Sequence, residues 1–232
     1  PDLSRHLQGL PVRPQALIVG EPTEMKVVNA HKGCCAIRTT VTGLEGHSSE
    51  THKGVNSIFA AAKLINYLAE RAEEMQTTNV NPRFDPPYTT IQVGTINGGT
   101  AGNIIPKETT FWWEYRTCPG VNGAEIVADF EAFAQAEVLP KMRAVHPEAD
   151  IRVEVRGEVI PLLPEEGSPA ETLVLALTGS NQTHAVSYGT EAGIFQKGGV
   201  ASVICGPGSI SVAHKPDEYI DVSQVEACED LM

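Results

Sequence analysis

Two residues far apart in the sequence have side chains of the kinds that bind metal ions. Glu21 follows the apolar run 16–20 and precedes Pro22, which fixes the chain direction and offers no N–H donor. A carboxylate at the C-terminal end of a buried strand lies where α/β sheets bind ligands. The simpler explanation is a glutamate in a surface turn, so position alone does not decide between them.

His214 is the second candidate metal ligand. It follows the apolar segment 201–205, and imidazole suits zinc, cobalt or manganese. Asp217 or Glu218 could hold the second ring nitrogen, as carboxylates beside metal-bound histidines do. The alternative is a loop histidine without a role.

A glycine- and serine-rich loop at 46–49 contains a candidate catalytic histidine. His47 could polarise a substrate carbonyl and stabilise an oxyanion. The serines of the same loop could instead serve only to satisfy backbone donors at a helix start.

Three further places could contact a substrate. Asn103 offers a side-chain amide on a glycine-rich turn, and Arg116 has the planar group that suits a carboxylate or, alternatively, a salt bridge in the sheet. Gly189 and Thr190 open the segment 189–193, whose backbone N–H groups could cradle a carboxylate or simply turn a strand into a helix.

The hydropathy pattern predicts the elements that position these residues. Between about residues 31 and 159, strands are expected at 35–41, 89–96, 108–115 and 151–159, and helices at 55–72 and 123–138. The order β-α-β-β-α-β predicts a ferredoxin-like unit, a four-stranded antiparallel sheet with two helices on one face. The flanking segments, with strands at 16–20 and 201–205 and helices at 170–178 and from 223, are expected to pack as one discontinuous α/β domain.

Composition excludes some classes of partner. The net charge of −12 repels phosphate backbones, which argues against nucleic acid. No apolar run reaches the roughly 20 residues of a membrane span. Five cysteines without Cys-x-x-Cys spacing fit reduced thiols, and we expect a cytoplasmic protein.

Six motifs occur together in a characteristic order. They are Gly20-Glu21-Pro22-Thr23, His31-Lys32-Gly33, Gly46-His47-Ser48-Ser49, Asn103-Ile104-Ile105-Pro106, Gly189-Thr190-Glu191-Ala192 and Gly206-Pro207-Gly208 followed by Ala213-His214-Lys215-Pro216-Asp217-Glu218-Tyr219. In this arrangement the sequence resembles the M20 metallopeptidase family, and within it most closely the acetylornithine deacetylases.

The resemblance implies an α/β fold with an α+β insert. Residues 1–29 and 160–232 would form part of a zinc-aminopeptidase-like catalytic domain, and residues 30–159 a ferredoxin-like lid and dimerisation domain. The complete protein would bind two divalent metal ions, zinc or cobalt. The implied roles are metal ligands for Glu21 and His214, oxyanion stabilisation in the partner subunit for His47, and substrate contacts for Asn103, Arg116, Gly189 and Thr190.

The sequence also departs from the family pattern. The family has an upstream His-x-Asp, a bridging aspartate and a Glu-Glu pair, and none of these is recognisable here; the pairs at 73–74 and 165–166 read as solvated charges. We therefore expect the chain to be part of a longer enzyme and to be inactive alone, because two ligands cannot hold a dinuclear centre.

The implied reaction is hydrolysis of a small N-acyl amino acid, first of all N2-acetylornithine in arginine biosynthesis. A succinyl-diaminopimelate desuccinylase, an aminoacylase and a dipeptidase of the same family remain alternatives. So does a non-enzymatic dimerisation module with a degenerate site.

Overall fold

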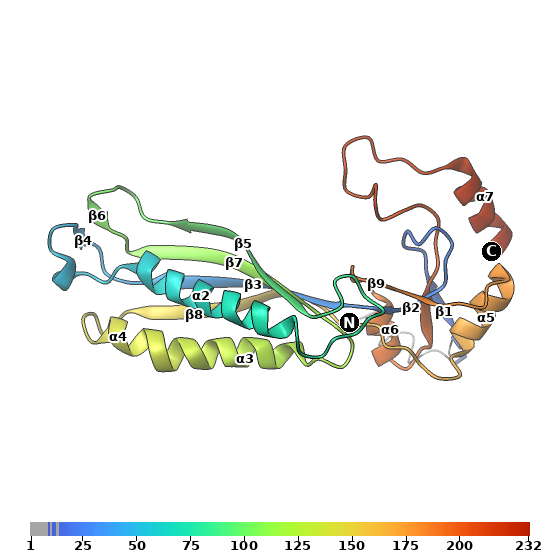
Figure 1. Ribbon diagram of the computed structural model, residues 1–232, viewed down its shortest axis with the longest axis horizontal. Coiled ribbons are helices and arrows are strands. Elements are labelled where there is room, and N and C mark those ends of the chain that lie inside the picture. The colour runs from blue at the N-terminus through green and yellow to red at the C-terminus, as the bar shows by residue number, and fades with distance from the viewer. Residues whose placement is uncertain (1–8, 10, 13) are drawn as a thin grey trace. The chain divides into compact units, whose positions relative to one another are not determined.

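The chain is divided into two compact units, seen in a computed structural model that describes residues 9, 11–12 and 14–232 (Figure 1). Unit 1 contains Pro1–Gly33, Asn81–Asp85 and Val159–Met232, and unit 2 contains Cys34–Val80 and Pro86–Glu158. Residues 1–8, 10 and 13 of the expected segment 1–29 lie outside the described residues. Within the described ranges, no helix is long and apolar enough to cross a membrane.

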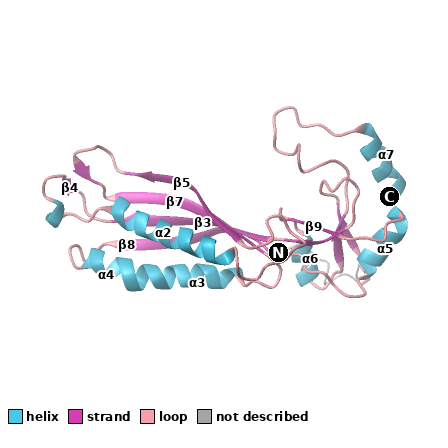
Figure 2. Ribbon diagram, in the orientation of Figure 1, coloured by secondary structure: helices cyan, strands magenta, loops and turns pink. Residues whose placement is uncertain are grey.

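Unit 2 has the predicted ferredoxin-like architecture. Its sheet has the order β5-β7-β3-β8, formed by β3 (Gly33–Thr42), β5 (Thr90–Gly98), β7 (Glu108–Thr117) and β8 (Asp150–Val159). Strands β5 and β7 pair in antiparallel fashion, with a register shift between Val93 and Thr95. The helices α2 (Ser57–Met75) and α3 (Gly123–Phe133) lie on one face of this sheet (Figure 2).

Helix α2 forms because its apolar residues recur at helical spacing. Ala61, Leu64 and Leu68 are buried on one face, and the Asn56 side chain caps the helix by accepting the Phe59 N–H at 3.0 Å. These residues pack against alternate residues of the strands, among them Ile37.

The second helix runs further than the pattern predicted. Helix α3 continues through a π-helical turn, η2 (Ala134–Val138), into α4 (Leu139–Arg143). Pro140 at the start of α4 lacks an N–H and its ring would clash with the preceding turn of a regular helix. A widened π turn accommodates such a residue without ending the helix.

Aromatic rings fill the core of unit 2. Trp113 and Phe111 on β7 are buried, and both rings contact Phe130 of α3, with centroid distances of 4.9 and 6.5 Å. The Trp113 Nε1–H donates to Thr39 Oγ1 at 3.0 Å, so its polar atom is satisfied.

Two short strands and a 3-10 turn form one end of unit 2. Strand β4 (Gly46–His47) pairs in antiparallel fashion with β6 (Ile104–Ile105), and η1 (Thr51–Lys53) follows β4. The sequence pattern predicted only a loop here, because strands of two residues have no detectable periodicity.

Unit 1 is built on a second four-stranded sheet. Its order is β1-β10-β2-β9, with β1 (Leu17–Val19), β2 (Val28–His31), β9 (His184–Val186) and β10 (Ser202–Ile204). β1 and β10 are parallel, β10 and β2 antiparallel, and β2 and β9 parallel. The strand at 16–20 was predicted to be buried; β1 is instead a partly exposed edge strand, because among the described strands it has a neighbour only on its β10 side.

The described part of unit 1 also contains the helices α5 (Pro169–Thr178), α6 (Ala192–Lys197) and α7 (Val222–Leu231). Ala170 and Val174 of α5 pack with Val27, Val203 and Cys205 in a small core. α5 begins with a cap in which Ser168 Oγ accepts the Glu171 N–H.

Candidate functional site

The turn that bears Glu21 lies beside the loop that leads to His214. β1 and β10 are parallel neighbours, so the segments that follow them leave the same edge of the sheet. Thr23 N–H and Met25 N–H both donate to the Gly206 carbonyl, at 3.1 and 3.0 Å, and Glu24 N–H donates to the Gly208 carbonyl at 2.8 Å. Backbone hydrogen bonds therefore connect the turn after Glu21 to the Gly206–Gly208 segment that begins the His214 loop.

The Glu21 side chain is half-buried. Among the described residues we find no hydrogen bond to its carboxylate, so both carboxylate oxygens are available to bind a ligand. Burial, and to a smaller extent the negative charge of Glu21, raises the pKa of the Tyr188 hydroxyl to about 12. Tyr188 is thus neutral over the whole physiological range and can donate a hydrogen bond near Glu21.

His214 is exposed in the long loop between β10 and α7. Its backbone is left-handed, with φ of 59°, and its N–H donates to Glu218 Oε2 at 3.0 Å. The carboxylate that sequence spacing suggested for the second ring nitrogen therefore binds the backbone of His214 instead. This contact holds the backbone of the turn at His214. It does not involve the imidazole ring, so it does not set the orientation of the ring.

A hollow lies between these segments. It has a volume of about 240 Å³ and is lined by residues of the Glu21 turn, of β9 and its following turn, and of the loop after Gly208, among them Pro22, Thr23, His184, Tyr188, Ser209 and Ile210. The hollow is smaller than the roughly 300–1,000 Å³ of ligand pockets, and neither Glu21 nor His214 is among its lining residues.

The donor types present fit part of a metal site. A glutamate carboxylate and a histidine imidazole are both accepted by zinc and cobalt. In the part of the chain that the structure describes, however, no group of three or more His, Cys, Asp or Glu side chains is arranged to hold a metal ion. Glu21 and His214 can therefore contribute to a metal centre but do not complete one.

Gly189 and Thr190 lie in unit 1, between β9 and α6. A Cβ on Gly189 would come within 2.8 Å of the Val159 side chain, so glycine is required by packing there. The buried Thr190 Oγ1 accepts the Ala192 N–H at 3.1 Å. The strand-to-helix turn that was the alternative explanation of this segment is thus present.

His47 and Asn103 come together at the β4–β6 end of unit 2. His47 pairs with Ile104 across the two strands, and the Ser48 N–H donates to the Asn103 carbonyl at 3.0 Å. Both residues are exposed. The His47 Nδ1 lies 2.8 Å from Ser49 Oγ, which orients the ring and leaves Nε2 for another partner. The sequence proposed both residues without predicting that they are neighbours.

Arg116 lies near the C-terminal end of β7 in the four-stranded sheet, whereas β6 and Asn103 precede the start of β7. Eight residues along β7 separate it from Glu108, which corresponds to about 27 Å at the rise of a β-strand. Its Nε is 3.2 Å from Glu114 Oε1, the ion pair that its sequence context also allowed. Within one subunit, Arg116 therefore cannot act on the same atoms as His47 and Asn103.

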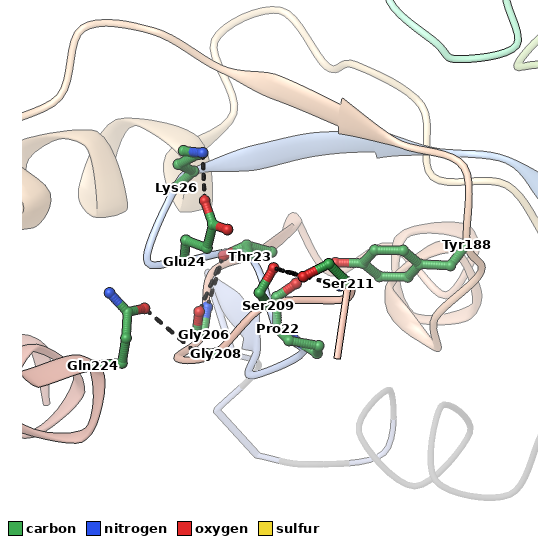
Figure 3. A network of polar contacts seen from close by, with 10 residues as sticks. All are labelled: Pro22, Thr23, Glu24, Lys26, Tyr188, Gly206, Gly208, Ser209, Ser211 and Gln224. Carbon is green, nitrogen blue, oxygen red and sulfur yellow. Dashed lines mark hydrogen bonds and ion pairs between the residues drawn. The ribbon is translucent and has the colours of Figure 1, made fainter. Parts of the chain in front are cut away.

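Sequence reasoning did not single out three residues that bind the Glu21 turn: Thr23, Tyr188 and Gly206 (Figure 3). The Tyr188 hydroxyl donates to the Pro22 carbonyl at 2.8 Å, and Thr23 Oγ1 contacts Gly206. The only available signal was their presence in or beside motifs that already carried a candidate, since their partners are far away in sequence.

The fold defines a class of architecture: a mixed α/β unit built on a four-stranded sheet, combined with a ferredoxin-like module. Residues 29–142 match the family model described as a peptidase dimerisation domain of the M20 type. The chain is 34% identical over 232 residues to the acetylornithine deacetylase of Myxococcus xanthus, covering 95% of this chain and 56% of the relative. It is likewise 34% identical to that of Proteus mirabilis, covering 95% and 55%.

Solved structures share the fold. The aminopeptidase PepT of Bacillus cereus matches with a TM-score of 0.70 and 16% identity, over 98% of this chain and 58% of that one. The di-peptidase Dug1p of Saccharomyces cerevisiae matches with a TM-score of 0.65 and 13% identity, over 99% and 60%. The chain belongs to the M20 family, and it spans little more than half the length of the curated relatives it matches.

Proposed function

We propose that the protein to which this chain belongs is a metal-dependent amidohydrolase that deacetylates N2-acetylornithine in arginine biosynthesis. The structural observation that carries the proposal is the junction of the Glu21 turn with the Gly206–Gly208 segment, which brings two expected ligand-bearing segments to one sheet edge. The named relatives, which match nearly the whole chain, support the choice of substrate.

In this proposal residues 1–29 and 160–232 contribute to the catalytic domain. Glu21 and His214 each ligate one of two divalent ions, zinc or cobalt, which when bound lower the pKa of water and polarise the acyl carbonyl. Gly189 and Thr190 line the substrate side of the same unit. The remaining ligands and the general base come from outside these residues.

Residues 30–159 act as the lid and dimerisation domain. His47 and Asn103 share the exposed β4–β6 end of it, whereas Arg116 lies about 27 Å along β7 from Glu108, the first residue of that strand. This separation supports a homodimer in which these residues act in different active sites. Arg116 binds substrate in its own subunit, while His47 and Asn103 act in the active site of the partner subunit. His47 stabilises the oxyanion there, a contribution on the order of 10²–10³ in rate.

All five cysteines carry free thiols. Unpaired thiols are typical of a reducing compartment, and we propose that the protein is cytoplasmic.

Subunit mixing tests the proposed division of labour. In the protein as its gene encodes it, His47→Ala and Glu21→Ala should each be nearly inactive. Random mixing of the two should restore about one quarter of wild-type activity, because half of the dimers are then mixed and each holds one intact site. No recovery after verified subunit exchange would show that His47 does not act in the partner subunit.

A substrate panel tests the reaction. N2-acetylornithine should be hydrolysed with the highest kcat/KM, ahead of N-succinyl-diaminopimelate, other N-acetyl amino acids and dipeptides. Preference for one of the latter would move the assignment to that branch of the family. Absence of hydrolysis across the panel with zinc or cobalt supplied would favour a non-enzymatic dimerisation module.

A further inference from the structure

One buried hydroxyl joins the segments that carry the two proposed ligands. Thr23 is only 7% exposed, and its Oγ1 donates to the Gly206 carbonyl at 3.2 Å while accepting the Gly206 N–H at 3.1 Å (Figure 3). The hydroxyl thus contacts both backbone groups of a residue that lies 183 positions away in sequence. The Gly206 carbonyl also accepts the Thr23 and Met25 N–H groups, whereas the Gly206 N–H donates to this hydroxyl, and a buried N–H left without a partner would be costly.

Gly206 allows the close approach that the hydroxyl needs. A Cβ at this position would lie 2.5 Å from the carbonyl carbon and oxygen of Gly20 and 2.6 Å from the backbone carbonyl oxygen of Glu21. The backbone of the Gly206 loop therefore lies directly against the backbone of the residue proposed as a metal ligand. A displacement of either segment must move the other.

Tyr188 holds the same turn from a second side. Its hydroxyl donates to the Pro22 carbonyl at 2.8 Å, between the proposed ligand Glu21 and Thr23. The turn itself is unusual, because Glu24 and Met25 both have left-handed backbones, with φ of 56° and 57°. Non-glycine residues adopt this conformation at a cost, so external contacts are needed to maintain it.

We propose that Thr23 is a positioning residue, which through its paired hydrogen bonds to Gly206 sets the position of Glu21 relative to the His214 loop. Tyr188 supports the same turn through Pro22. Neither side chain ligates metal or touches the reacting atoms. This inference rests on the proposed function, because it assumes that Glu21 and His214 act on one metal centre.

The test compares Thr23→Val with Thr23→Ser in the protein as its gene encodes it. Valine keeps the shape but removes the hydroxyl, and serine keeps the hydroxyl. Ser202→Ala is the matched control, since Ser202 is buried in the neighbouring strand β10 and its Oγ donates to the Val200 carbonyl at 2.9 Å. It loses a hydroxyl hydrogen bond in the same sheet without affecting the junction.

The readouts are the zinc and cobalt dissociation constants and the separate values of kcat and KM. Thr23→Val should weaken the more weakly held metal about 10-fold, as loss of groups that orient ligands does, and should lower kcat more than it raises KM. Thr23→Ser and Ser202→Ala should stay within about twofold of wild type. Equal metal affinity in Thr23→Val and Ser202→Ala would overturn the inference.

Tyr188→Phe covers the case in which Thr23→Val does not fold. It removes only the hydrogen bond to Pro22, and we expect about fivefold weaker metal binding, equivalent to one neutral hydrogen bond. Unchanged affinity in this variant would also contradict the inference.

Two further variants separate this inference from the proposed function. Glu21→Ala and His214→Ala should each lose bound metal. If they keep it, the ligand assignment itself fails. If they lose it while Thr23→Val binds metal as Ser202→Ala does, only the positioning role fails.

Discussion

Gly206→Ala should destabilise unit 1 strongly and leave unit 2 almost unaffected. The new Cβ would lie 2.5 to 2.6 Å from backbone atoms of Gly20 and Glu21, and backbone cannot rotate away as a long side chain can. Overpacking of this kind costs typically 1–3 kcal/mol. Separation of the two segments would also weaken the hydrogen bonds that Thr23 and Met25 donate to Gly206, each contributing about 1 kcal/mol. We expect a loss of about 3 kcal/mol in the free energy of unfolding of unit 1.

The chain provides separate readouts for its two units. Both tryptophans of the sequence lie on β7 in unit 2, so tryptophan fluorescence follows unit 2 alone, whereas far-UV circular dichroism follows both units. In urea, the unfolding of unit 1 is therefore the transition that is seen by circular dichroism and not by fluorescence. Its midpoint should shift to a urea concentration about 1–2 M lower, because the free energy of unfolding typically falls by ~2 kcal/mol per M urea.

Gly20→Ala is the matched control, because a Cβ at Gly20 meets no atom within 4 Å although the residue adjoins the same turn. The reasoning is refuted if Gly206→Ala and Gly20→Ala unfold at the same urea concentration. It is also refuted if the fluorescence transition moves as far as the dichroism transition.

Two other predictions concern single buried residues. Leu64→Ala in α2 removes a fully buried side chain and should lower the stability of unit 2 by about 2–5 kcal/mol, while Phe59→Ala on the exposed face of the same helix should change it little; the fluorescence-monitored urea midpoint distinguishes them. His31 is buried, which lowers the pKa of its imidazole, the effect being partly offset by the Lys32 carbonyl and the charge of Glu191. Its folded pKa lies below the unfolded value, so the unfolded state binds more protons at mildly acidic pH and stability is lost as pH falls through about 6.5. Urea midpoints at pH 7.5 and 5.5 should therefore differ more in wild type than in His31→Gln, and equal differences would contradict this account of His31.

The elements with long periodic patterns could be predicted from the sequence. Helix α2 and strands β3 and β7 follow one period over nine or more residues, and the β-α-β-β-α-β order of the six expected elements predicted the ferredoxin-like unit. Strand β2 could not be predicted in this way, because Asn29 and His31 interrupt its apolar pattern. Both are buried. The Asn29 side chain has distant partners, Glu171 at 2.8 Å and Arg83 at 2.6 Å, whereas the His31 Nδ1 lies 2.8 Å from the carbonyl of the adjacent Lys32.

The sequence predicted which residues could form the candidate site, but it did not predict how those residues contact one another in space. Glu21 and His214 were indicated by strand ends followed by characteristic residues. The bonds from Thr23 to Gly206 and from Tyr188 to Pro22 depend on which strands become neighbours, and a periodic pattern does not specify that. Similarly, the pairing of β4 with β6 that unites His47 and Asn103 arises from two-residue strands, too short to have a period.

The metal content of three variants tests the central claim most directly. In the protein as its gene encodes it, wild type should bind two equivalents of zinc or cobalt and release acetate from N2-acetylornithine. Glu21→Ala and His214→Ala should each lose about one tightly bound equivalent and most activity, whereas Glu165→Ala, at an exposed loop position, should keep both. Two retained equivalents with normal acetate release in Glu21→Ala or His214→Ala would contradict the account.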